Sequence, residues 1–385
     1  MRPPRRATCD LFPTHTGTGV LLVALFMGTS AGCGAPSDAE GEDYVARTAD
    51  AITGPVPGPA RVPIRSICLA CPRTVTLGGT PTSLAVANGT VFWSGGLGSG
   101  ASVEFGIFSV PASGGASTLF LSASGTANAT PDSLVALGGA LYWQLPGDDG
   151  GTWTMPTAGG TATELMSIPD LKAQRQGIAA AQVTSSWPLE LRLLLSFTSV
   201  LSTDPSNSHL WAFGRSTFFP TWQTTTLVDG DVSDSIGVYY PDNVTMDATN
   251  AYFVSNRSTG GNGVYQISRS GGTPLLLAAT ADHQSPIATY GGNVYFVTSD
   301  SIVTVPVGGG TQSTLVTDAG PPTTFAVDGA TLYWTCTTCG TVSKMAFTGG
   351  AVTTVASGEQ APEFLAVDAS NLYWGATNAV RTHTK

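Results

Sequence analysis

The sequence has few charged residues, few histidines and no long apolar run. Only 11% of its 385 residues are Asp, Glu, Lys or Arg, and four are His. The apolar run Val20–Met27 is far shorter than the roughly 20 residues that span a bilayer. The 26 acidic and 16 basic residues give a net charge of −10, which argues against nucleic acid or an anionic membrane surface as a partner.

Catalytic motifs are also missing from the sequence. His209, His283 and His383 lie in no motif that would make them a general base. Neither Gly-x-Ser-x-Gly nor His-Glu-x-x-His occurs. The sequence therefore predicts no catalytic residue, no cofactor-binding residue and no cofactor. Carboxylates brought together by loops remain an alternative, because sequence spacing does not reveal such pairs.

What the sequence does contain is an internal repeat. A seven-residue interval ends six times on a Trp or Phe that closes an aromatic cluster, and five of the six intervals begin five residues after a proline. Repeats of this kind indicate an array of identical structural units. The intervals run from Val86 to Trp93, Ala136 to Trp143, Met246 to Phe253, Thr289 to Phe296, Val327 to Trp334 and Val367 to Trp374.

Each unit is typical of four short antiparallel strands. The unit after Pro322 predicts strands over Phe325–Val327, Leu332–Trp334, Thr341–Met345 and Ala351–Val355. A turn at Asp328–Ala330 separates the first two, and a tight hairpin at Gly349-Gly350 separates the last two. Four such strands in about 40 residues make one blade of a β-propeller. The glycine pair recurs at Gly114-Gly115, Gly159-Gly160, Gly271-Gly272 and Gly309-Gly310.

The spacing of the repeats predicts seven blades, with six as the alternative. The gap between Trp143 and Phe253 is long enough for two units, so we expect a hidden repeat there. The last repeat lacks a fourth strand, and Thr74–Leu77 resembles one, so residues 73–385 would form a propeller closed by an N-terminal strand. The strands of the hidden repeat are expected at Ile178–Val183, Leu191–Phe197, His209–Phe213 and Thr224–Val228.

The repeat resembles the YWTD propellers of the low-density-lipoprotein-receptor type. Two units carry the resemblance, Phe325–Asp328 followed by Leu332–Thr335, and Leu365–Asp368 followed by Leu372–Trp374. The family's Asp after Tyr-Trp-Thr is missing, and those propellers usually have six blades. The resemblance therefore implies the fold and no particular ligand. With its export signal, the chain is also similar to uncharacterised bacterial lipoproteins that carry propeller domains.

The N-terminus has the pattern of a lipoprotein-type signal peptide over residues 1–32. Arginines precede the apolar core Val20–Met27, and Ser30-Ala31-Gly32-Cys33 resembles the bacterial lipobox, although Ser30 stands where Leu is usual. We expect Cys33 to be lipidated and residues 33–72 to be a disordered tether. The localisation would be the bacterial cell envelope, at the outer membrane or cell surface. Ordinary cleavage into the periplasm or medium is the alternative.

Four further cysteines form two short pairs, Cys68 with Cys71 and Cys336 with Cys339. The first pair should precede a fourth strand, and the second should cap a hairpin between second and third strands on the opposite face of the disc. Because an exported protein meets an oxidising environment, two local disulfides are favoured over one zinc site. Alternating carboxylates at Asp229, Asp231 and Asp234 suit calcium, but a solvated acidic loop is the simpler interpretation.

Two functions are compatible with this organisation. The first is a lipid-anchored binding or scaffold module for a protein or a glycan, because Gly- and Ser-rich loops on a rigid scaffold suit recognition. The second is a propeller enzyme, a polysaccharide lyase or glycosidase, with its site at the channel mouth. The small inner-strand residues favour the first: Ala85, Val135, Ala288, Ala326 and Ala366. The expected recognition loops are Ser94–Phe105, Gln144–Gly151, Val254–Gly263 and Gly375–Asn378.

Overall fold

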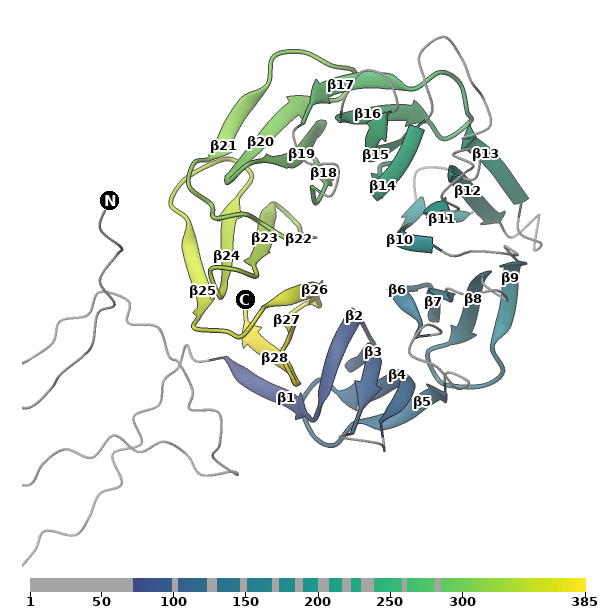
Figure 1. The fold of residues 1–385 in the computed structure, drawn as a ribbon, viewed down its shortest axis with the longest axis vertical. Coiled ribbons are helices and arrows are strands. Elements are labelled where there is room, and N and C mark those ends of the chain that lie inside the picture. Colours follow the sequence, from purple (N-terminus) through teal and green to yellow (C-terminus); the bar gives the residue numbers. More distant parts are fainter. Residues whose placement is uncertain are drawn as a thin grey trace, which may run out of the picture. The chain divides into compact units, whose positions relative to one another are not determined.

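The protein is an all-β propeller of four-stranded antiparallel blades. Its computed structural model describes residues 72–98, 103–122, 130–145, 151–167, 173–183, 190–199, 208–216, 223–229, 239–257, 262–280 and 285–385. The strands of these residues form seven four-stranded sheets, which Figure 1 shows around a central axis. No helix in the described residues is long and apolar enough to cross a membrane.

The sheets, here called blades 1 to 7, follow one another along the chain. Blade 1 contains β2 (Gly79–Ala87), β3 (Thr90–Leu97), β4 (Glu104–Pro111) and β5 (Thr118–Ser122). Blade 2 contains β6 (Asp132–Leu137), β7 (Ala140–Leu145), β8 (Gly151–Pro156) and β9 (Thr163–Ser167). Blade 3 contains β10 (Ala173–Val183), β11 (Glu190–Ser199), β12 (Ser208–Ser216) and β13 (Gln223–Asp229). Blade 4 contains β14 (Tyr239–Met246), β15 (Asn250–Arg257), β16 (Gly263–Ser268) and β17 (Leu275–Ala279).

The remaining blades complete the arrangement. Blade 5 contains β18 (Ala288–Tyr290), β19 (Asn293–Thr298), β20 (Ser301–Pro306) and β21 (Ser313–Val316). Blade 6 contains β22 (Thr324–Asp328), β23 (Thr331–Cys336), β24 (Thr341–Ala346) and β25 (Thr353–Ser357). Blade 7 contains β26 (Glu363–Val367), β27 (Asn371–Ala376), β28 (Ala379–Thr384) and, as its outer strand, β1 (Arg73–Leu77).

The aromatic landmarks lie in the second strand of each repeat and join neighbouring blades. Successive side chains of a strand point to opposite faces of the sheet. Tyr333 accordingly packs in one cluster with Trp374 of blade 7, while Trp334 packs in another with Tyr295 of blade 5. The same division holds for Phe92 and Trp93, for Tyr252 and Phe253, and for Tyr295 and Phe296.

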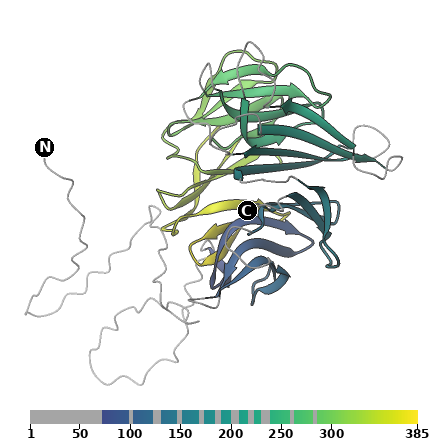
Figure 2. The ribbon, with the colours of Figure 1, turned by 45° about the vertical axis from the view of Figure 1, so that its right-hand side comes forward.

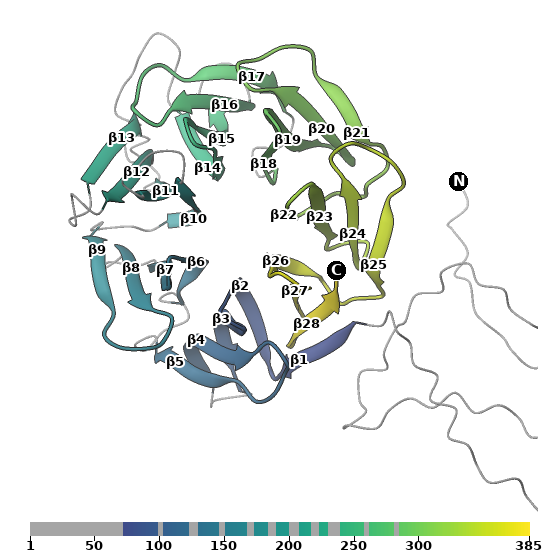
Figure 3. The ribbon, with the colours of Figure 1, turned by 180° about the vertical axis from the view of Figure 1, so that it is seen from behind.

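The outer strand of blade 7 comes from the other end of the chain. β1 pairs antiparallel with β28, with Arg73 opposite Thr382 and Leu77 opposite Ala379. Val75 is only 2% exposed and shares a core cluster with Trp93 of blade 1 and Tyr373 of blade 7. Figures 1 and 3 both show β1 beside β28, next to blade 1. The segment predicted at Thr74–Leu77 therefore supplies the strand that the last repeat lacks.

The glycine pairs lie between the third and fourth strands, but they do not form the predicted tight hairpin. In blade 6, Gly349 closes a four-residue turn by donating its N–H to the Ala346 carbonyl at 2.9 Å, and β25 begins only at Thr353. Both glycines have positive φ, of 88° and 123°. The predicted fourth strand therefore starts two residues too early, because the residues after the pair still belong to the connection. Gly114, Gly159, Gly271 and Gly309 make the same bond.

Blade 3 occupies the long gap between the sequence landmarks. The four segments expected there all fall within β10, β11, β12 and β13, which form one sheet. Its first three strands have 11, 10 and 9 residues, longer than most of the others. Figure 2 shows these strands, in teal, extending to one side of the disc. This blade has no counterpart of the proline and glycine-pair landmarks, which explains why the repeat was hidden.

We predict that β1 contributes to stability as a core strand. Replacing Val75 with Ala should lower the free energy of unfolding by about 2 kcal/mol, because it empties part of the cluster between blades 7 and 1. Leu77 lies two residues further along and is 69% exposed, so Leu77→Ala is the matched control and should change little. Urea denaturation of the two variants measures this difference. Equal stability of both would show that β1 does not pack as described.

Candidate functional site

The connections between strands divide the disc into two faces. One, here called the linker face, carries the turns between second and third strands and the linkers between blades. The other, the turn face, carries the turns between first and second strands and between third and fourth strands. Each inner strand begins on the linker face. The described parts of the predicted recognition loops lie there, since they end or begin β3, β4, β7, β8, β15, β16 and β27.

Hydroxyl and amide groups on the linker face join neighbouring blades. The Ser83 hydroxyl of blade 1 accepts a hydrogen bond of 2.8 Å from the Leu134 N–H of blade 2. Asn243 of blade 4 donates its side-chain amide to the Ser285 carbonyl at 3.2 Å, ahead of blade 5. The Thr337 hydroxyl of blade 6 donates to the Pro362 carbonyl at 3.0 Å, ahead of blade 7. These contacts set the spacing of the blades around the channel mouth.

Two carboxylates begin inner strands on this face. Asp132 is the first residue of β6 and Glu363 the first residue of β26. Burial raises the pKa of Asp132, against the lowering effect of the Ser133 N–H, which donates to its Oδ1 at 2.7 Å. Burial also raises the pKa of Glu363, and the nearby charge of Asp132 raises it further. Among the residues whose side chains the structure describes, none forms an ion pair with either carboxylate.

Carboxylates on the turn face are satisfied within the protein. Asp368 Oδ1 accepts the N–H groups of Ser370 and Asn371, each at 2.7 Å, and Oδ2 accepts the Tyr373 hydroxyl at 2.7 Å. Burial alone would raise the pKa of Asp368, but these donors and the charge of Lys385 hold it below its usual value. Burial and Asp368 together raise the pKa of Tyr373 to about 12. Asp247 makes the same contacts with Asn250 and Tyr252 in blade 4.

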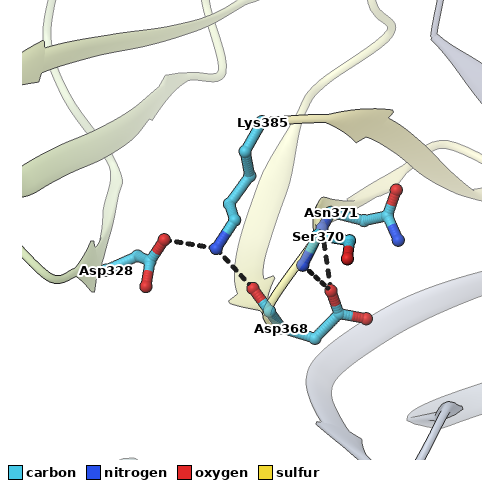
Figure 4. A network of polar contacts seen from close by, with 5 residues as sticks. All are labelled: Asp328, Asp368, Ser370, Asn371 and Lys385. Carbon is cyan, nitrogen blue, oxygen red and sulfur yellow. Dashed lines mark hydrogen bonds and ion pairs between the residues drawn. The ribbon is translucent and has the colours of Figure 1, made fainter.

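Lys385 connects the turns of blades 6 and 7 (Figure 4). Its ammonium group forms an ion pair with Asp328 and donates to the Asp368 carbonyl at 2.6 Å. Asp328 and Asp368 hold equivalent places in the two repeats. Asp328 is the last residue of β22, and Asp368 directly follows β26. Asp247, Asp328 and Asp368 of the turn face are therefore bound within the protein, in contrast with Asp132 and Glu363.

The predicted disulfide between Cys336 and Cys339 is present and spans the turn from β23 to β24. This places it on the linker face, as the repeat pattern indicated. Cys68, Cys71 and the predicted lipidation site Cys33 lie outside the residues that the structure describes. Of the proposed calcium ligands, Asp229 ends β13, whereas Asp231 and Asp234 also lie outside. The described segments contain no cluster of three or more groups that could hold a metal ion.

Sequence reasoning missed the carboxylate pair, although part of the signal was available. Glu363 directly follows a landmark proline and Asp132 follows another, so both sit where inner strands begin. The recurring spacing of five residues between Asp and Tyr, at Asp247, Asp328 and Asp368, would have identified the structural carboxylates. What the sequence could not provide was the proximity of strands that are more than 200 residues apart.

Comparisons with known proteins support the propeller fold and nothing finer. No protein-family profile and no curated protein matches the sequence. The solved structure "AfRom2 CNH domain" is similar over 82% of this chain and 99% of its own, with 10% identity and a TM-score of 0.50. A chain from a nidogen/laminin complex is similar over 71% of this chain and 89% of its own, with 13% identity and a TM-score of 0.43. BamB from Moraxella catarrhalis is similar over 78% and 82%, with 13% identity and a TM-score of 0.42. The likeness to the first of these structures concerns the fold alone.

The opposite pKa shifts of Asp132 and Asp368 predict opposite effects of charge removal. Asp368→Asn should lower stability near pH 7 by on the order of 1 kcal/mol, since it loses a charged acceptor of three hydrogen bonds. Asp132→Asn should raise stability near pH 7, because the charged form of a carboxyl with a raised pKa is disfavoured in the folded state.

Both differences should disappear in acid. The stabilising charge of Asp368 is present above the unfolded pKa and is lost as pH falls through the lower folded pKa. The cost of Asp132 is absent below the unfolded pKa and appears as pH rises through the higher folded pKa. Thermal melting of both variants and the unmodified chain between about pH 3 and pH 7 measures this. Shifts of the same sign at neutral pH would contradict the assigned environments.

Proposed function

We propose that the protein is an exported, lipid-anchored binding module whose propeller recognises a protein or a glycan with its linker face. The contrast between the two faces is the observation that supports this. Asp247 and Asp368 of the turn face accept internal hydrogen bonds and have lowered pKa values. Asp132 and Glu363 have raised pKa values, and neither forms an ion pair with a residue whose side chain the structure describes. Charged groups whose own fold does not stabilise them suit contact with a ligand that donates hydrogen bonds.

The proposed ligand approaches along the channel axis, where the blades meet. Its donors, amide or ammonium groups of a protein or hydroxyls of a glycan, would bind Asp132 and Glu363. The Ser83 hydroxyl holds the start of β6 against blade 1, and the Thr337 hydroxyl holds the residue before Glu363 against blade 6. A rigid arrangement reduces the entropy lost on binding. The net charge of −10 favours a neutral or basic ligand over an acidic one.

Binding is tested with a double variant and a control on the other face. Asp132→Asn with Glu363→Gln should weaken binding to glycan arrays or to isolated envelope proteins at least tenfold. Val352→Ser changes a 44% exposed side chain of the turn face and should leave binding unchanged. Because Asp132→Asn is expected to stabilise the fold, a loss of binding would not reflect unfolding. Equal binding by both variants would exclude the linker-face carboxylates.

The same carboxylate pair favours a second candidate, a propeller glycosidase. A carboxyl with a raised pKa can act as a general acid, and a second one nearby can act as a base or nucleophile. Turnover of the bound glycan that is abolished by Glu363→Gln alone would support this candidate. Binding without release of products would support the binding module.

We also propose that Cys33 carries the anchor, as the lipobox-like sequence Ser30–Cys33 indicates. Cys33→Ser should move the protein from the membrane to the soluble fraction of a bacterial host, because a lipid chain adds about 0.8 kcal/mol of membrane affinity per buried methylene group. Fractionation followed by mass measurement of the N-terminal peptide tests this. Membrane partitioning that is unchanged in the variant would contradict lipidation.

A further inference from the structure

On the linker face, the two cysteines of the Cys336–Cys339 disulfide have different surroundings. Cys336 is fully buried at the end of β23, whereas Cys339 is exposed in the turn that follows. A backbone N–H, that of Cys339, donates to Cys336 Sγ at 3.1 Å, and the Thr338 hydroxyl lies 3.6 Å from the same sulfur. Cys339 is therefore the more accessible of the two residues, and Cys336 Sγ has one N–H donor and one hydroxyl close to it.

We propose that the Cys336–Cys339 disulfide is a thiol-exchange site, which an external thiol opens at Cys339. The attacking thiolate forms a bond to Cys339 Sγ, the bond between the two cysteines breaks, and its electron pair leaves on Cys336 as a thiolate. The N–H of Cys339 and the Thr338 hydroxyl stabilise that thiolate, and a better stabilised leaving group speeds exchange. A second thiolate, from a dithiol reductant, completes the reduction by releasing Cys339.

The disulfide turn contacts the two linkers that lead into and out of blade 6. A Cβ at Gly320, in the linker ahead of blade 6, would lie 2.5 Å from Cys339 Sγ, so the backbone there packs directly on the disulfide. Thr337, between the two cysteines, donates to Pro362 at 3.0 Å. Gly340, just after them, accepts the Glu359 N–H at 3.1 Å. The turn therefore positions the linker that leads into blade 7.

Glu359 extends this set of contacts to the outer strand of blade 7. Its carboxylate accepts the Trp374 indole N–H at 3.1 Å and forms an ion pair with Arg381 at 3.3 Å. Arg381 in turn donates to the Thr74 hydroxyl of β1 at 2.8 Å. Opening the disulfide removes a constraint from the turn that holds Glu359. Reduction should therefore loosen the linker 358–362 first and the attachment of β1 second.

The direction of exchange is tested with glutathione disulfide and two single-cysteine variants of the full chain. In Cys336→Ser, Cys339 should form a mixed disulfide with glutathione under native conditions. In Cys339→Ser, the buried Cys336 should react at least tenfold more slowly. Fragmentation mass spectrometry of the peptide that spans both positions identifies the modified sulfur. Equal rates at the two positions, or a faster reaction of Cys336, would overturn the proposal.

A second measurement separates an exchangeable bond from a purely structural one. In the unmodified protein, dithiothreitol should reduce this disulfide at least tenfold faster than the protein unfolds, as measured by dilution into urea. Reduction should lower the hydrogen-exchange protection of residues 358–362 and leave that of β15, on the other side of the disc, unchanged. Reduction no faster than global unfolding, or unchanged protection of the linker, would show that the disulfide is only a structural crosslink.

Discussion

The fold depends on the pairing of two adjacent aromatic side chains in the second strand of a blade. Because neighbouring positions of a strand face opposite sides of the sheet, one ring packs on the following blade and the other on the preceding blade. Tyr333 and Trp334 are both almost completely buried in this way. A blade with only one of the two rings would cover only one of its neighbours in this way. Six blades have the pair, and blade 3 is the exception, because β11 has no two adjacent aromatic residues.

This constraint explains why the two faces of the disc can differ. The aromatic clusters hold the blades from within, so the connections at either end of the strands are free to take different chemistry. On the turn face, Asp247 and Asp368 bind the hydroxyls of Tyr252 and Tyr373, which belong to the same aromatic pairs. On the linker face the hydroxyls of Ser83 and Thr337 join blades directly, and burial raises the pKa values of Asp132 and Glu363.

The sequence predicted the strands well, because aromatic pairs, prolines and glycines recur at nearly constant spacing. It placed the outer strand of blade 7 at Thr74–Leu77 and the strands of blade 3 where the structure has them. It failed on the connections: the Gly349-Gly350 pair completes a four-residue turn rather than a tight hairpin. The carboxylate pair could not be foreseen, since Asp132 and Glu363 are brought together only by the circular arrangement of the blades.

Several polar side-chain interactions gather in blade 7, whose outer strand comes from the other end of the chain. Between most blades the chain is continuous, so a linker limits how far they separate. Blade 7 instead holds β1 without any such linker to β28, so non-covalent contacts connect the two ends. Two of the chain's few basic residues, Arg381 and Lys385, lie in this blade and bind Thr74, Glu359 and Asp328. An outer strand is paired on one edge only, so it separates from its sheet more easily than an inner strand does. The Arg381 contact with Thr74 adds to the backbone pairing that keeps β1 on β28. The Cys336–Cys339 turn, which is followed by the Gly340 carbonyl that accepts the Glu359 N–H, is therefore well placed to influence this junction.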